Sequence, residues 1–184
     1  MRYIILSIID PACQGPLHPA QLDLWRRLDY HDLELTYTEV HVNMPYEYLD
    51  HQADLGIRGI GKTPQEAFSE GAQAMLAAMA NVDLVDPTTE FVQRCSAPDA
   101  PTLFVEWLNE LLYQREVNDM LFASAQVTHM ENSETEWVLE GIAKGEPLDL
   151  DCHEIYTEVK AATYAGLDYR KERDLWIVQC VIDL

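Results

Sequence analysis

Basic residues are scarce in this sequence. Its 184 residues include 12 lysines and arginines against 32 aspartates and glutamates, so the formal net charge at pH 7 is −20. Such a surface repels phosphate groups and offers few of the cations that displace counterions from nucleic acid. The composition disfavours tight direct binding of nucleic acid and favours a basic protein partner or divalent cations. A merely soluble acidic protein would have the same composition.

Closely spaced cysteines and long apolar runs are also lacking. The four cysteines form no CxxC pair and no cluster with histidine at the spacing of zinc ligands, so we expect reduced, mostly structural thiols: Cys13, Cys95, Cys152 and Cys180. The apolar run 4–9 ends at Asp10 and has only Arg2 before it, which makes a poor signal peptide. It is also far too short to span a bilayer. We therefore expect a cytoplasmic protein.

Signatures of common catalytic and nucleotide-binding sites are missing from the sequence. There is no EF-hand run, no HExxH, no GxxxxGK[ST] and no GxGxxG after a strand. His129, His153 and the carboxylates of Asp149 and Asp151 could suggest a hydrolase. A loop rich in aspartate, proline and glycine is more often a solvated connection, and no Ser/His/Asp or Cys/His arrangement is legible. The residues by themselves indicate no enzyme.

The length and the 48% hydrophobic content suit one domain with one core. The beginning of the chain has a different pattern, with a β-like run at residues 3–9, several prolines and glycines, and a short helical pattern at residues 21–28. We assign residues 1–43 to an N-terminal extension of unknown role, which is either an added element or the result of a start codon chosen upstream of Met44. Residues 44–184 form the main domain.

Strand and helix signals alternate in the main domain. Thr63, Pro64 and Glu66 form the capping box that begins a helix, and Asp99 and Pro101 begin a second. Alternating apolar and β-branched residues predict strands at 46–49, 55–60, 88–97, 120–129, 137–143, 157–169 and 175–183. This order predicts an α+β two-layer sandwich, with a mostly antiparallel β-sheet and two helices packed on one face.

Two aspartates at predicted strand ends form the candidate site. Asp54 lies between the first two predicted strands, and Asp183 is the penultimate residue. If the last strand returns beside the first strands, both side chains and the terminal carboxylate of Leu184 converge on one site for a hard cation. Each aspartate alone has a simpler interpretation, because Asp54 could be a turn residue and Asp183 part of a solvated chain end.

Several short segments, taken in order, resemble the archease family, whose members activate the RNA ligase that joins tRNA exons after intron removal. They are His51–Ile57, Gly61–Thr63, Trp107–Tyr113, Gly145–Pro147, Val159–Tyr164 and Val181–Leu184. The resemblance spans residues 44–184 and implies the archease-like fold. The sequence departs from the family pattern at Gln52, where threonine is common, and at Ala165, where a histidine often follows the Thr-Tyr pair.

The resemblance implies a divalent metal ion held by Asp54, Asp183 and Leu184, either calcium or, in function, magnesium or manganese. Water or a partner must complete the shell of six to eight oxygens that calcium prefers. It also implies a non-enzymatic protein that promotes GTP-dependent guanylylation and multiple turnover of an RtcB-type RNA ligase in tRNA splicing. The GTP belongs to the ligase.

Two further residues and two further functions stay open at this point. His51 and Lys160 could contact the partner or its nucleotide, although His51 could equally be a bystander and Lys160 could neutralise part of the acidic surface. A metal-dependent phosphoesterase that uses the same carboxylates is one alternative function. A chaperone-like modulator of a tRNA methyltransferase, a role also proposed for archeases, is another.

Overall fold

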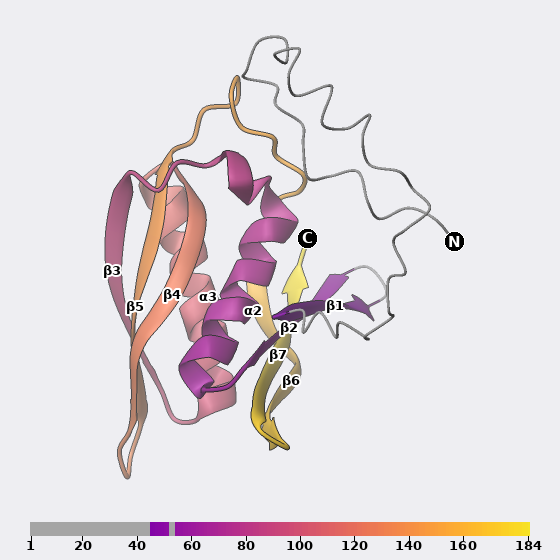
Figure 1. Ribbon diagram of the computed structural model, residues 1–184, viewed down its shortest axis with the longest axis vertical. Helices are drawn as coiled ribbons and strands as arrows, with labels where there is room; N and C mark the ends of the chain where they lie inside the picture. The colour runs from indigo at the N-terminus through magenta and orange to yellow at the C-terminus, as the bar shows by residue number, and fades with distance from the viewer. Residues whose placement is uncertain (1–44, 52–53) are drawn as a thin grey trace, which may run out of the picture. The chain divides into compact units, whose positions relative to one another are not determined.

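The computed structural model describes residues 45–51 and 54–184, so the extension at 1–43, Cys13 and Gln52 lie outside the described part of the chain (Figure 1). Its elements are β1 (Tyr46–His51), β2 (Asp54–Gly61), α2 (Pro64–Met79), the 3-10 helix η1 (Val82–Leu84), β3 (Thr89–Ala97), α3 (Ala100–Val117), β4 (Met120–Asn132), β5 (Trp137–Pro147), β6 (Ala161–Glu172) and β7 (Leu175–Asp183). The predicted α+β class is confirmed. Within the described residues, no helix is long and apolar enough to cross a membrane.

The described strands form two antiparallel sheets. One has the order β1-β2-β7-β6 and the other the order β3-β5-β4. The helices lie between them, because α2 packs against β2 and β4 while α3 packs against β6 and β3 (Figure 1). Each sheet therefore has helices on one face. The division of the strands into two sheets is the feature that the sequence did not indicate.

Both helices begin where the capping residues predict. The Thr63 hydroxyl accepts a hydrogen bond of 3.1 Å from the Glu66 N–H. The Glu66 carboxylate accepts one of 2.6 Å from the N–H of Lys62, one residue before the cap rather than at it. At α3 the Asp99 carboxylate accepts a hydrogen bond of 2.8 Å from the Thr102 N–H, and this hydrogen bond holds the pKa of Asp99 below its usual value. Local side chains thus fix both helix starts.

The core lies where α2 and α3 meet each other and the sheets. The fully buried rings of Phe68 and Phe104 pack edge to face with centroids 5.2 Å apart. Gly59 lets α2 lie directly on β2, since a Cβ there would be 1.9 Å from the Ala67 carbonyl oxygen. This contact holds the sheet that carries the chain end against the helix.

Two of the three described cysteines are buried. Cys95, Cys152 and Cys180 are free cysteines, of which Cys95 and Cys180 are buried. Burial raises the pKa of each buried thiol to about 12, so both stay protonated.

The last strand returns to the middle of its sheet. β7 lies between β2 and β6 and is antiparallel to both. β6 begins at Ala161 rather than at residue 157 and continues to Glu172. The end of the chain is therefore beside the start of β2.

Candidate functional site

The register of β2 against β7 brings Asp54 and Asp183 together. Leu55 lies opposite Ile182, so the next position of the same register sets Asp54 opposite Asp183. Ile182 is fully buried in the core. Because successive side chains of a strand alternate between faces, the two aspartates project from the face away from the helices.

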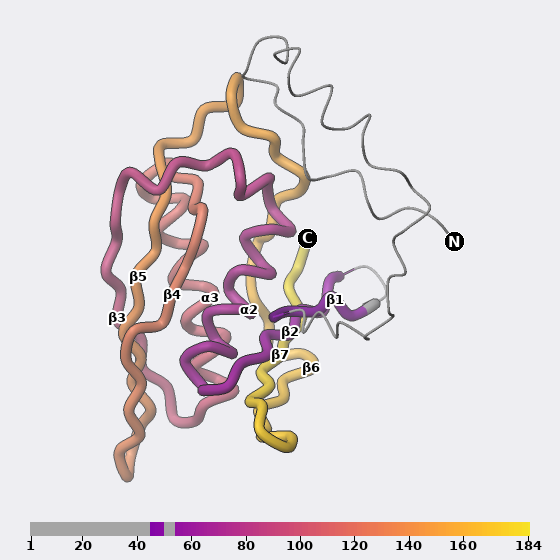
Figure 2. Tube along the Cα trace, in the orientation of Figure 1, coloured from indigo at the N-terminus to yellow at the C-terminus, as the bar shows by residue number. Residues whose placement is uncertain are grey.

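Asp54 and Asp183 belong to a row of opposed residues that crosses all four strands of the sheet. In β1, His51 is opposite Asp54, and in β6, Ala161 is opposite Asp183. His51 is placed here by its backbone, since its side chain lies outside what the structure describes. The row thus contains His51, both aspartates and Ala161, and Figure 2 follows the trace of β7 to this end of the sheet.

Lys160 contacts the end of the chain. Its N–H donates to the Asp183 carbonyl oxygen at 2.9 Å, which extends the pairing of β6 with β7 by one residue. Its ammonium group donates to the main-chain oxygen of Leu184 at 2.7 Å. Lys160 therefore lies just before β6, rather than within it as predicted, and places a positive charge at the candidate site.

The donor set suits a hard divalent cation but is small. The residues brought together offer carboxylate and main-chain oxygens, which calcium, magnesium and manganese prefer. In residues 45–51 and 54–184, no group of three or more histidine, cysteine, aspartate or glutamate side chains is arranged to hold a metal ion. A metal at Asp54 and Asp183 would need the oxygen of Leu184 and further ligands from water or a partner. The same oxygen of Leu184 accepts the hydrogen bond from the Lys160 ammonium.

A bulge in β6 lies next to the row of aspartates. The pairing with β7 shifts between Thr163 and Asp168, and residues 164–167 leave the regular ladder. Gly166 has a φ of 63°, in the left-handed region that favours glycine. Ala165 is exposed in this bulge. The position at which the family resemblance leads one to expect a histidine is therefore an exposed one, and Ala165 supplies no titratable group there.

Helix α3 holds the start of β6 through Asn109. The Asn109 amide donates to the Ala162 carbonyl oxygen at 3.1 Å and accepts from the Ala162 N–H at 2.9 Å. The Tyr164 hydroxyl also donates to the Glu106 carboxylate at 2.6 Å, which raises the pKa of Tyr164. Sequence reasoning named the segment Trp107–Tyr113 as part of the resemblance and missed this role. An asparagine among the apolar residues of a helix is the signal that could have indicated it.

We expect Asn109→Leu to lower the free energy of unfolding by about 2 kcal/mol, because it leaves the Ala162 N–H and carbonyl without their partner. Asn109→Asp should cost less, since it keeps the acceptor for the Ala162 N–H. Urea denaturation measures both, and hydrogen exchange at the Ala162 amide should accelerate in the leucine variant. Unchanged protection of that amide would show that Asn109 does not hold β6.

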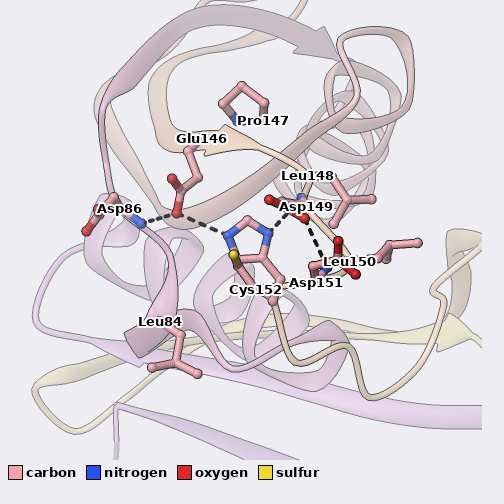
Figure 3. Close-up of a pocket in the computed structure, with 10 residues that line it drawn as sticks. Leu84, Asp86, Glu146, Pro147, Leu148, Asp149, Leu150, Asp151 and Cys152 are labelled. Carbon is pink, nitrogen blue, oxygen red and sulfur yellow. Dashed lines mark hydrogen bonds and ion pairs between the residues drawn. The ribbon is translucent and has the colours of Figure 1, made fainter. Parts of the chain in front are cut away.

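A second polar cluster lies in the loop after β5, around a hollow of about 810 Å³ (Figure 3). His153 is bonded through both ring nitrogens: Nδ1 accepts from the Asp149 N–H at 3.0 Å, and Nε2 lies 3.1 Å from the Glu146 carboxylate. Glu146 also accepts from the Asp86 N–H at 2.7 Å, and this bond and the one from His153 lower the pKa of Glu146. The side chain of His153 is only 4% exposed. His153 therefore holds the loop together.

The cysteine of this loop does not form a nucleophile with His153. Hydrogen bonding to Asp149 raises the pKa of the Cys152 thiol, whereas a catalytic cysteine needs a lowered one. The loop, like the sequence, indicates no Cys/His catalytic pair.

Comparison with known proteins identifies the family. Residues 46–184 match the family described as "Archease protein family". Curated relatives include the archease of Methanopyrus kandleri, 34% identical over 141 residues, which covers 77% of this chain and 100% of the relative. The archease of Methanosarcina mazei is 36% identical over 139 residues, which cover 76% of this chain and 95% of that relative.

One solved structure has a similar fold over most of this chain. The solution structure of Methanobacterium thermoautotrophicum protein 1598 has a TM-score of 0.67 and 27% identity, and the match covers 77% of this chain and 99% of that one. The crystal structure of an archease from Thermotoga maritima, described as a possible chaperone, has a TM-score of 0.44 and 17% identity. That match covers 75% of this chain and 96% of the other. From the family match and the curated relatives, this chain belongs to the archease family.

Proposed function

We propose that this protein is a non-enzymatic, metal-binding activator of an RtcB-type RNA ligase in tRNA splicing and RNA repair. The observation that carries the proposal is the register of β2 against β7 at the end of the β1-β2-β7-β6 sheet, whose next position sets Asp54 opposite Asp183, the chain neighbour of Leu184. Membership of the archease family supports the choice of partner.

The residues of this row would bind a divalent cation and present it to the partner. Asp54, Asp183 and the terminal carboxylate of Leu184 supply three anionic groups, fewer than the six to eight oxygens that calcium prefers. The remaining positions can be filled by water, by the ligase or by its GTP. The cation, when bound, supplies charge that offsets repulsion between phosphate groups.

The rest of the chain suits a partner-directed role. The charge of −20 attracts a basic, phosphate-binding cleft electrostatically and repels free RNA. In the loop after β5, bonds to Asp149 and Glu146 occupy both ring nitrogens of His153, so this loop does not provide a Cys/His pair. We assign guanylylation to the ligase, with this protein acting on its rate.

The test is single-turnover guanylylation of the ligase by GTP, with and without this protein at a tenth of the ligase concentration. We expect the protein to raise the rate about tenfold or more and to sustain multiple turnover. An unchanged rate would contradict the proposal. The control is this protein alone with RNA that ends in a 2′,3′-cyclic phosphate: turnover there would identify a metal-dependent phosphoesterase. Retention of a tRNA methyltransferase in a pull-down, with guanylylation unchanged, would favour the chaperone-like role.

A further inference from the structure

Within the described residues, the outer strand of the second sheet, β3, has one unpaired edge. Among the described strands, β3 has only β5 as a partner, and it pairs with β5 over nine residues without a bulge (Figure 1). Natural sheets protect such edges with short strands, bulges, prolines or charged side chains, lysine above all. The sequence of β3, TEFVQRCSA, contains neither proline nor lysine, and its two charged residues, Glu90 and Arg94, lie near oppositely charged partners on β5.

The opposite edge of the same sheet is protected. In β4 the Val127 N–H donates to the Ser69 hydroxyl at 2.9 Å, and the Gln73 amide donates to the Ala123 carbonyl oxygen at 3.1 Å. Both side chains come from α2. β4 also contains two register shifts. The contrast leaves β3 as the strand of this sheet that is open to pairing.

The solvent-facing side chains of β3 have an ordered charge pattern. Glu90 lies 3.1 Å from the Lys144 ammonium and Arg94 lies 3.8 Å from the Glu140 carboxylate, both on β5. Between them is Val92, which is 75% exposed. The strand therefore presents a negative charge, an apolar side chain and a positive charge at alternate positions.

We propose that β3 pairs with β3 of a second copy of this chain, in antiparallel orientation, with the twofold axis at Val92. This register sets Glu90 of each copy opposite Arg94 of the other copy and sets the two Val92 side chains against each other. Such an interface is isologous, because the same residues contribute from both copies. The three-stranded sheets would join into one of six strands.

Alternative twofold registers fit less well. An axis at Glu90 or at Arg94 sets like charges opposite each other, which destabilises a strand pair. An axis at Phe91 sets Glu90 opposite Val92, and an axis at Gln93 sets Arg94 opposite Val92. Of the five registers centred on residues 90–94, only the one at Val92 pairs both charges with opposite charges.

The chosen register also continues the charge ladders already present. Across four strands, the order becomes Glu140, Arg94, then Glu90 and Lys144 of the second copy, with alternating signs throughout. Each exposed pair contributes little alone. The net charge of −20 opposes association over longer distances, which salt screens more effectively than contacts of 3–4 Å. We therefore expect dimerisation to be clearer at physiological ionic strength than in low salt.

Charge exchange tests the pairing. We expect Glu90→Arg and Arg94→Glu each to weaken dimerisation of the full chain at least about tenfold, because each sets like charges opposite each other at both ends of the strand. In an equimolar mixture of the two variants, position 90 of each copy again faces an opposite charge at position 94 of the other. The dissociation constant of this mixed dimer should lie within about threefold of that of the unsubstituted protein. Sedimentation velocity over a range of concentrations measures this. Variants that dimerise as well as the unsubstituted chain, a mixture that fails to associate, or an unsubstituted chain that stays monomeric throughout would overturn the proposal.

Cross-linking tests the register. In a chain carrying Cys13→Ser and Cys152→Ser, Val92→Cys places one thiol on the twofold axis, so mild oxidation should link two copies. Glu90→Cys in the same background should link far more slowly, since its position faces Arg94 of the other copy. Equal rates for the two variants would exclude the axis at Val92.

Discussion

Asp183→Asn will lower the affinity for calcium and manganese at least about 100-fold and abolish activation of the ligase, while the fold stays intact. Loss of a residue that only supports a metal ligand typically costs 10–100-fold in affinity, and Asp183 is proposed as a ligand itself. Asparagine keeps the size of the side chain and the main-chain oxygen that accepts from the Lys160 N–H. Asp54→Asn should have the same effect from the opposite strand.

The matched control is Asp174→Asn, which removes the same charge from the exposed turn at the other end of β7. It should bind metal and activate the ligase as the unsubstituted protein does. Calorimetric titration and single-turnover guanylylation measure the two effects, and thermal unfolding checks the fold. If Asp183→Asn binds metal normally, the proposed site is wrong, whatever its effect on activation.

The fold was predictable from the sequence where local chemistry decides it. The caps at Thr63 and Asp99 bond the backbone within three residues, so both helix starts could be predicted. The number of sheets could not, because strand pairing depends on contacts between distant residues. Val92 illustrates this: its alternation with polar neighbours indicates a strand, but nothing local shows that this strand lies at the edge of a second sheet.

The residues of the candidate site were named from the sequence, and their convergence was expected on the condition that the last strand returns beside the first strands. The sequence and the resemblance indicated Asp54, Asp183 and Leu184, whereas their opposition depends on the register of β2 against β7. The hydrogen bonds of Asn109 with Ala162 and of Lys160 with Leu184 link residues that are far apart in the chain. A side chain at the start of a strand has no local feature that shows which distant atom it reaches.

The contact of Lys160 with Leu184 predicts a second role for Lys160, as a cation that competes with the metal ion for the Leu184 carboxylate. Its ammonium lies 2.7 Å from an oxygen that the proposed metal would use. Lys160 is exposed, so the interaction is that of charges in water, about 1 kcal/mol for two unit charges 4 Å apart. The repulsion between the Lys160 ammonium and a divalent cation at the same distance is twice as large, because the ion carries two charges. Removing the ammonium should therefore favour metal binding by about 1–2 kcal/mol, or roughly tenfold.

We accordingly expect Lys160→Met to bind calcium or manganese about tenfold more tightly, and Lys160→Arg, which keeps the charge, to bind as the unsubstituted protein does. Lys62→Met removes an equal charge from an exposed position outside the site and controls for the change in net charge. Calorimetric titration at fixed salt measures all three. Activation then separates the two roles of Lys160: if its ammonium, once displaced by metal, contacts the ligase or its nucleotide, Lys160→Met will activate poorly despite its tighter metal binding. Weaker or unchanged affinity in Lys160→Met would show that Lys160 does not compete with the metal.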